Sequence, residues 1–380
     1  MNSSLRTRAV TCITPKLALF APLRSAGSST LPAFIADLRQ LRQKETFVSG
    51  VEVSIEDLGT DGTERRESAQ LIQESGFDLL VNVDINGDGK IGMENIGAGS
   101  SSSISSKMVQ SFASHLVKVS DLGDIVSHIN FRSFGTRRVR RAEATNNLTQ
   151  MWDDDVALEY LLDVLPLSAQ FLEDHPYIGN RGNEIDVMGG SPDHLTGISH
   201  ETTAFRHNID SVESNDIGIL HNPTIVRHLL ETIPPLRLTM DLSSWHDVHG
   251  YPWGYSTDVD EAEALSVEIV PHIDLIRTRT SLLSDCYTNK KVNSTRSDQF
   301  LRTHQSMWKE VWTRKTTRGV KEVYMTVEDD GYESTAEFEE NSYTSRMERL
   351  RDSIRAIRRC YDSWLRAHES EASSDSKLKR

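Results

Sequence analysis

The stretch GVEVSIEDLGTDGTERRESAQLIQESGFDLLVNV, residues 50–83, holds one complete strand–helix–strand unit. Gly50–Ile55 is rich in β-branched residues and predicts a strand, and Phe77–Val83 predicts a second one. Between them, Thr63–Ser75 has helical periodicity and is followed by Gly76, the residue type that most often ends a helix. This order predicts two parallel strands joined by a crossover helix.

The same alternation continues on both sides of this unit. Runs of β-branched and apolar residues predict further strands at Lys16–Phe20, Ile125–Phe131, Leu195–His200, Leu236–Met240, His272–Ile276 and Val320–Val327. Helical periodicity predicts further helices at Thr30–Gln43, about Ser105 to Val119, Asp154–Leu172, Pro223–Thr232, around Asp260–Val267, Asp298–Trp312 and Tyr343–His368. Eight strand–helix pairs in strict alternation predict an α/β fold, a single (βα)₈ TIM barrel. An open doubly wound sheet is the alternative, and no glycine-rich dinucleotide-binding sequence follows a strand to support it.

The two ends of the chain differ in composition from the predicted barrel, which we expect over residues 15–366. Residues 1–14 are expected to be a flexible N-terminus or a targeting segment, because no acidic residue precedes Asp37 and acid-poor, basic, serine-rich sequence is typical of organellar transit peptides. Residues 367–380 are rich in serine, glutamate and lysine and predict a disordered polar tail.

The overall composition argues against several classes of partner, although a local basic patch remains compatible with it. The chain has 42 basic and 56 acidic residues, a net charge of −14, whereas nucleic-acid binding needs a broad basic surface. Its three cysteines are too few and too scattered for a disulfide framework or a cysteine-type zinc site, which indicates a reducing, cytoplasmic environment. No apolar run approaches the roughly 20 residues that a membrane helix needs, so we expect no membrane partner.

Three acidic residues follow predicted strands directly. They are Glu201, Asp241 and Glu328, after the fifth, sixth and eighth strands. Residues at the carboxyl ends of barrel strands point into the active site, so these carboxylates are expected at one mouth of the barrel. Because like charges repel, either a divalent cation such as Mn²⁺, Mg²⁺ or Co²⁺ holds them together or some are protonated. Helix caps or solvated loop residues are the alternative interpretation of single acids at strand ends.

The segments around these acids resemble, in order, the motifs of a known family, the xylose isomerase-like TIM barrel family of sugar phosphate isomerases and epimerases. The resemblance runs from about Ser49 to Tyr332. It is carried by Ser49–Ser54, Ile198–Arg206, Leu220–Pro223, Ile233–Trp245, Pro271–Arg279 and Tyr324–Tyr332. Each motif is short, and the ordered set carries the specificity.

The resemblance implies a function and a set of site residues. In this family one divalent ion is held by Glu, Asp, His and Glu, and the two glutamates also move a proton at a carbon next to a sugar carbonyl. Carried over, Glu201, Asp241 and Glu328 become metal ligands, and Glu201 and Glu328 become the catalytic acid/base pair. A carbohydrate substrate is implied, with contacts expected from Glu52, His200, Arg206, Trp245, His246 and Arg279. For Arg279, an ion pair within the protein is the alternative.

Two substitutions depart from the family pattern. Arg277 stands where the fourth ligand, a histidine, is expected, and Ser244 replaces another histidine. Arginine cannot ligate a cation, so metal binding is expected to be weak or lost. His272 begins the seventh strand and should lie at the opposite end of the barrel. The alternative function is therefore a catalytically degenerate barrel that binds a sugar-like ligand or a protein partner.

Other features suit the barrel without deciding its function. An endonuclease IV-like DNA repair enzyme shares the fold, but the negative charge and the shortage of histidines disfavour it. Asp84–Ile91 resembles the start of a calcium-binding loop, with a polar loop after a strand as the preferred interpretation. The basic run Arg137–Arg141 would attract an anionic substrate, or is a solvated loop balanced by Asp153–Asp155. A second copy of the chain, in a homo-oligomer, is a further candidate partner.

Overall fold

Eight parallel strands close into a barrel in this computed structural model, in the order β1-β10-β9-β8-β6-β4-β3-β2. The structure describes residues 16–22, 30–45, 48–84, 101–132, 137–139, 154–176, 178, 198–201, 215–217, 223–233, 236–241, 269, 272–279, 312–313, 322–328 and 342–378. The barrel strands are β1 (Lys16–Pro22), β2 (Val48–Ser54), β3 (Asp78–Asp84), β4 (Val126–Arg132), β6 (Ile198–Glu201), β8 (Leu238–Asp241), β9 (Ile273–Arg279) and β10 (Glu322–Glu328). Each one overlaps a predicted strand, and the predicted (βα)₈ barrel is confirmed.

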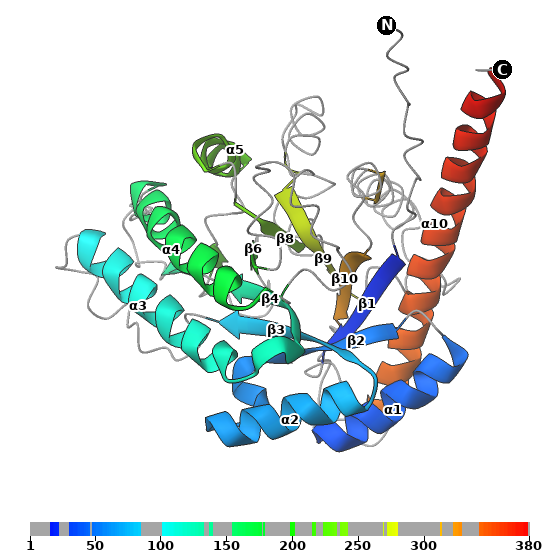
Figure 1. Ribbon diagram of the computed structural model, residues 1–380, viewed down its shortest axis with the longest axis horizontal. Helices are drawn as coiled ribbons and strands as arrows, with labels where there is room; N and C mark the ends of the chain where they lie inside the picture. Colours follow the sequence, from blue (N-terminus) through cyan, green and yellow to red (C-terminus); the bar gives the residue numbers. More distant parts are fainter. Residues whose placement is uncertain are drawn as a thin grey trace, which may run out of the picture.

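Helices lie outside the strands (Figure 1). They are α1 (Leu31–Lys44), α2 (Gly62–Glu74), α3 (Ser101–Ser120), α4 (Asp154–Asp174), α5 (Pro223–Thr232) and α10 (Ser342–Leu378), with 3₁₀ turns η2 (Ile55–Leu58) and η4 (Gly123–Ile125). The predicted helix at 260–267 lies outside the described residues, as does 298–312 except for Trp312. The calcium-loop resemblance also lies outside them beyond Asp84, the last residue of β3.

The two faces of the strands bury different kinds of side chain. Val51, Val53, Val81 and Val83 belong to the main apolar core, which also includes Phe34, Ile72 and Phe112 of the surrounding helices. On the alternate positions, Leu80, Leu275 and Tyr324 form a separate small cluster. Because strand side chains alternate between faces, this second cluster fills the barrel interior, and the first fills the layer between strands and helices.

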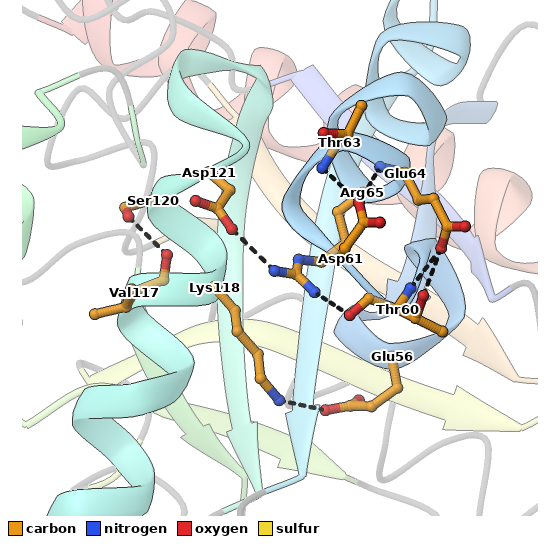
Figure 2. A network of polar contacts seen from close by, with 10 residues as sticks. All are labelled: Glu56, Thr60, Asp61, Thr63, Glu64, Arg65, Val117, Lys118, Ser120 and Asp121. Carbon is orange, nitrogen blue, oxygen red and sulfur yellow. Dashed lines mark hydrogen bonds and ion pairs between the residues drawn. The ribbon is translucent and has the colours of Figure 1, made fainter.

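Polar contacts cap the start of α2 and connect this helix to the end of α3 (Figure 2). Asp61 is the N-cap of α2, and its side chain accepts hydrogen bonds from the backbone N–H groups of Thr63 and Glu64 at 2.8 and 2.9 Å. Arg65, in the first turn, donates to Asp121 just after α3 at 2.9 Å. Caps of this kind satisfy N–H groups that a helix leaves without partners, and so they define where α2 begins.

The long helix α10 closes the fold against the first and last strands. It packs on β1 and β10, and Arg355 donates a hydrogen bond to Glu45 at the end of α1. Tyr361 and Trp364 pack against Trp312, with ring centroids 5.2 and 5.7 Å apart. The helix continues to Leu378, so the tail expected to be disordered at residues 367–380 is helical over most of its length. Extending an existing helix needs no new nucleus, so even this polar sequence can continue it.

Two short strands were not predicted. β5 (Arg137–Val139) and β7 (Asn215–Ile217) pair antiparallel, with Arg138 beside Asp216. β5 follows β4 and β7 follows β6, so both belong to connections that leave the carboxyl ends of barrel strands. Part of the basic run Arg137–Arg141 is therefore strand.

None of the helices in the described ranges combines the length and the apolar character needed to cross a bilayer.

Candidate functional site at the carboxyl end of the barrel

The predicted site acids are the last residues of their strands. Glu201 ends β6, Asp241 ends β8 and Glu328 ends β10. In the strand register, Asp241 lies beside Arg277 of β9, and Glu328 lies beside Arg279 of the same strand. The backbone thus brings these three acidic residues to the same end of the barrel as Arg277 and Arg279. The side chains of Glu201, Asp241, Arg279 and Glu328 lie outside the described part of the structure.

Contacts between strands that are not neighbours show which positions face the barrel interior. His128 of β4 lies 5.6 Å from Tyr324 of β10, and Glu52 of β2 accepts a hydrogen bond from Arg277 of β9. Neither pair of strands is adjacent in the sheet, so these side chains meet across the interior. In the register, the backbone of Asp241 lies beside that of Arg277.

A layer of buried polar groups lies in the barrel interior just below the carboxyl ends of the strands, which we call the rim. His128 Nε2 is hydrogen-bonded to Ser199 Oγ at 2.7 Å, and Ser199 Oγ to Thr239 Oγ1 at 2.6 Å. Ser199 comes two residues before Glu201, and Thr239 two residues before Asp241. Since strand side chains repeat every two residues, positions 201 and 241 lie on the interior face of their strands. The convergence of the acid side chains at one mouth stays a prediction, and the backbone places the three residues at the carboxyl ends of their strands.

Arg277 and Glu52 form a buried ion pair in the interior. Arg277 Nη2 donates to Glu52 Oε1, and the two side chains are 2% and 3% exposed. This partner explains how an arginine is accommodated in the place where the family resemblance implies a ligand histidine: the charge of the guanidinium is countered by a carboxylate. Glu52 was expected to contact substrate, and it is engaged by Arg277. The two residues are 225 apart in the chain, and no local pattern signals their contact.

His200 lies on the other face of β6. Its ring stacks on Phe131 at 6.0 Å and on Phe112 of α3 at 6.2 Å, within the layer between strands and helices. Burial lowers the pKa of His200 from 6.5 to about 4, so the ring is neutral at pH 7. Because Ser199 faces the interior, the residue after it must face outward. His200 is therefore a core side chain, and we do not carry it into the site as a substrate contact.

The remaining predicted residues divide into two groups. Arg206, Ser244, Trp245 and His246 lie outside the described residues. His272 immediately precedes β9, and its Nδ1 lies 3.2 Å from the carbonyl oxygen of Leu236, which precedes β8. It is thus at the amino end of the strands, opposite the rim, as expected. Among the side chains that the structure describes, no three His, Cys, Asp or Glu residues gather as a metal site would require.

No protein-family model and no curated protein sequence matches this chain. Its fold is similar to that of a D-psicose 3-epimerase solved in the presence of D-fructose, with 10% identity, a TM-score of 0.47, and coverage of 90% of this chain and 96% of that one. A sugar phosphate isomerase/epimerase from Parabacteroides distasonis is 10% identical, with a TM-score of 0.44 and coverage of 93% of this chain and 97% of that one. A broad-specificity endoglucanase from Clostridium acetobutylicum is 11% identical, with a TM-score of 0.42 and coverage of 89% of this chain and 96% of that one.

Similarity this distant says nothing about the reaction of this chain, because an endoglucanase matches about as well as the two isomerases do. The architecture rests on the strand order and register of the molecule itself. Together they identify the chain as a closed (βα)₈ barrel in which Glu201, Asp241 and Glu328 are the last residues of β6, β8 and β10.

Proposed function

We propose that this barrel is a divalent-metal-dependent isomerase or epimerase that acts on a sugar or sugar phosphate by proton transfer next to a carbonyl. The observation that supports it most is the register. Glu201 and Asp241 each lie two residues beyond a buried interior hydroxyl residue, at the end of barrel strands where this fold builds its active sites. The resemblance of the surrounding motifs to sugar isomerases supplies the reaction class.

The donor set suits a divalent cation. Carboxylate oxygens are the ligands that Mn²⁺ and Mg²⁺ prefer, and three of them come from Glu201, Asp241 and Glu328. Together with Glu52 they bring four negative charges, against two positive charges from Arg277 and Arg279. One divalent ion would neutralise the remainder. Because Glu52 already counters Arg277, that arginine takes the fourth ligand position without adding uncompensated positive charge to the site.

Each residue then has a distinct task. Glu201 accepts a proton from the carbon next to the carbonyl, and Glu328 delivers one, as the acid/base pair of the reaction. Asp241 serves as a ligand alone, and Arg279, beside Glu328 in the register, pairs with substrate oxygens or a phosphate. The ion, when bound, polarises the substrate carbonyl. The buried layer of His128, Ser199 and Thr239 excludes water below the reacting groups.

Calorimetric titration with Mn²⁺ tests the ligand set. We expect the substitutions Glu201→Gln, Asp241→Asn and Glu328→Gln each to weaken Mn²⁺ binding by at least about tenfold, the loss of roughly 1.4 kcal/mol or more that removing a charged ligand entails. Glu56→Gln is the matched control, because Glu56 lies on η2 and its carboxylate contacts His115 and Lys118 of the outer helix α3. Wild-type protein that binds none of Mn²⁺, Mg²⁺ or Co²⁺ would remove this mechanism.

A second measurement follows the proton itself. Incubation in D₂O with a panel of ketoses, aldoses and their phosphates should give deuterium at the carbon next to the carbonyl of the true substrate, detected by NMR. Glu201→Gln should abolish this incorporation, since it removes the base without changing the side-chain size.

A non-catalytic barrel that binds a sugar-like ligand is the second candidate. The observation that favours it is the Glu52–Arg277 pair, which places a buried ion pair at the interior position where the family resemblance implies a metal ligand. Sugar binding without deuterium incorporation, at any metal concentration, is the outcome that selects this alternative.

A further inference from the structure

Two buried oxygen atoms lie beside the Glu52–Arg277 pair. Glu52 Oε1 accepts from Arg277, whereas Glu52 Oε2 is buried and has no hydrogen-bond partner within the described part of the chain. Thr326 of β10 is 0% exposed, and its Oγ1 likewise has no partner among the groups that the structure describes.

Both atoms belong to the same part of the barrel interior. Thr326 is the register partner of Arg277 on the neighbouring strand, so the two side chains point to the same face. Arg277 reaches Glu52 across the interior. Asp241 lies on the other side of Arg277, at the same register level. The pair and Thr326 therefore form the floor of the rim site, one inward-facing layer below Arg279 and Glu328.

A carboxylate oxygen and a hydroxyl in such a place indicate a ligand that donates hydrogen bonds. Buried polar groups in folded proteins are almost always paired, with protein groups, ordered water or a ligand. A carboxylate is an acceptor only, and a threonine hydroxyl both accepts and donates. A phosphate would meet the negative charge of Glu52 here, whereas sugar hydroxyls match both atoms.

We propose that Glu52, Arg277 and Thr326 form a hydroxyl-binding subsite that holds adjacent hydroxyl groups of a neutral, polyhydroxylated part of the ligand. One hydroxyl donates to Glu52 Oε2, the next hydrogen-bonds with Thr326 Oγ1, and the guanidinium fixes the carboxylate between them. This inference rests on the proposed function, since it specifies which part of the substrate enters first and lies deepest. Any phosphate group stays at the level of Arg279.

Saturation-transfer NMR with xylitol as the neutral probe and inorganic phosphate as the anionic probe tests the subsite. Thr326→Val keeps the shape of the side chain and removes its hydroxyl, and it should weaken xylitol binding about tenfold, the usual effect of one lost hydrogen bond in a buried site. Glu52→Gln should weaken it further. Glu56→Gln, the control, should bind xylitol as the wild type does, and phosphate binding should not respond to Thr326→Val.

Equal xylitol binding by the wild type and Thr326→Val, or no xylitol binding at all, overturns the proposal and leaves a trapped water molecule as the partner of these atoms. Thr326→Val decides this even if Glu52→Gln fails to fold. A parallel Mn²⁺ titration separates the two proposals. Xylitol binding that depends on Thr326 in a protein without Mn²⁺ affinity supports the subsite and removes the isomerase mechanism; Mn²⁺ binding without xylitol binding does the reverse.

Discussion

Arg277 places a permanent positive charge inside the barrel, and the Glu52 carboxylate lies against it as a buried counter-charge. Both side chains are almost fully buried, so neither charge can be compensated by water. An isolated buried charge is strongly destabilising, whereas a buried pair is close to neutral in its net effect. Restoring a histidine at position 277 therefore changes two things at once: it offers a fourth metal ligand and leaves Glu52 without its cation.

We expect Arg277→His alone to lower the free energy of unfolding by about 3–5 kcal/mol, the cost of breaking a buried ion pair by removing one partner. The double variant Glu52→Gln/Arg277→His should regain most of this stability and bind Mn²⁺ more tightly than the wild type. Urea unfolding and calorimetry measure the two effects. A single variant as stable as the wild type would show that the pair is not the stabilising contact.

His200 makes stability depend on pH in a defined window. Its folded pKa of about 4 is below the unfolded value of 6.5, so the unfolded chain binds the extra proton first as the pH falls. Stability contributed by the neutral ring is complete above pH 6.5 and is lost between pH 6.5 and 4. From this shift we expect a loss of about 3 kcal/mol over that window.

His200→Phe should remove this part of the pH dependence, because phenylalanine can stack on Phe112 and Phe131 without titrating. Comparing denaturant unfolding of the variant and the wild type at pH 7, 6, 5 and 4 cancels the contribution of the carboxylates. Parallel pH profiles for the two proteins would contradict the prediction. His228, an exposed residue of α5, provides a control substitution.

At the scale of elements, the sequence predicts the barrel strands well and the additional strands poorly. The eight barrel strands overlap their predicted ranges because β-branched runs with flanking helical periodicity are a local signal. β5 and β7 are three residues each, and residues such as Arg137, Arg138 and Asp216 have no strand preference. β5 and β7 form by pairing with each other, a contact between segments far apart in the chain. The polar composition of residues 367–378 predicted disorder, whereas these residues continue α10. Composition alone does not show that a helix formed by the preceding residues extends into such a segment.

The start of α2 depends on Asp61. Replacing it with alanine removes two hydrogen bonds to backbone N–H groups and should cost about 0.5–2 kcal/mol of stability, as loss of an N-cap usually does. Glu67→Ala, at an exposed position of the same helix, is the matched control and should stay within about 0.5 kcal/mol of the wild type. Thermal or urea unfolding measures both. Equal effects would mean that helix propensity, rather than the cap, determines the change.

At the scale of the molecule, the proposed ligands come from strands that are far apart in the chain. β6, β8 and β10 meet at one rim only when the barrel is closed, so a cation held by all three would bind the folded chain and not the unfolded one. Excess Mn²⁺ should therefore raise the unfolding temperature, with about 2.7 kcal/mol of added stability at one hundred times the dissociation constant. Chelation with EDTA should reverse the shift, and Asp241→Asn should show a clearly smaller one at the same Mn²⁺ concentration. An unchanged unfolding temperature in the wild type contradicts the metal site.

The sequence by itself determined the barrel and the end of it at which the acids gather. Alternating strands and helices are read from local periodicity, and parallel closure then places Glu201, Asp241 and Glu328 at the carboxyl rim. The sequence also allows the prediction that His200 points away from the barrel interior. Side chains alternate between the two faces of a strand, and Ser199 occupies the interior face. Only the tertiary structure decided that Glu52 would be the partner of Arg277 and that Thr326 would lie beside it. Contacts across the interior depend on how the strands are staggered when the barrel closes, and no local pattern in the chain encodes that stagger.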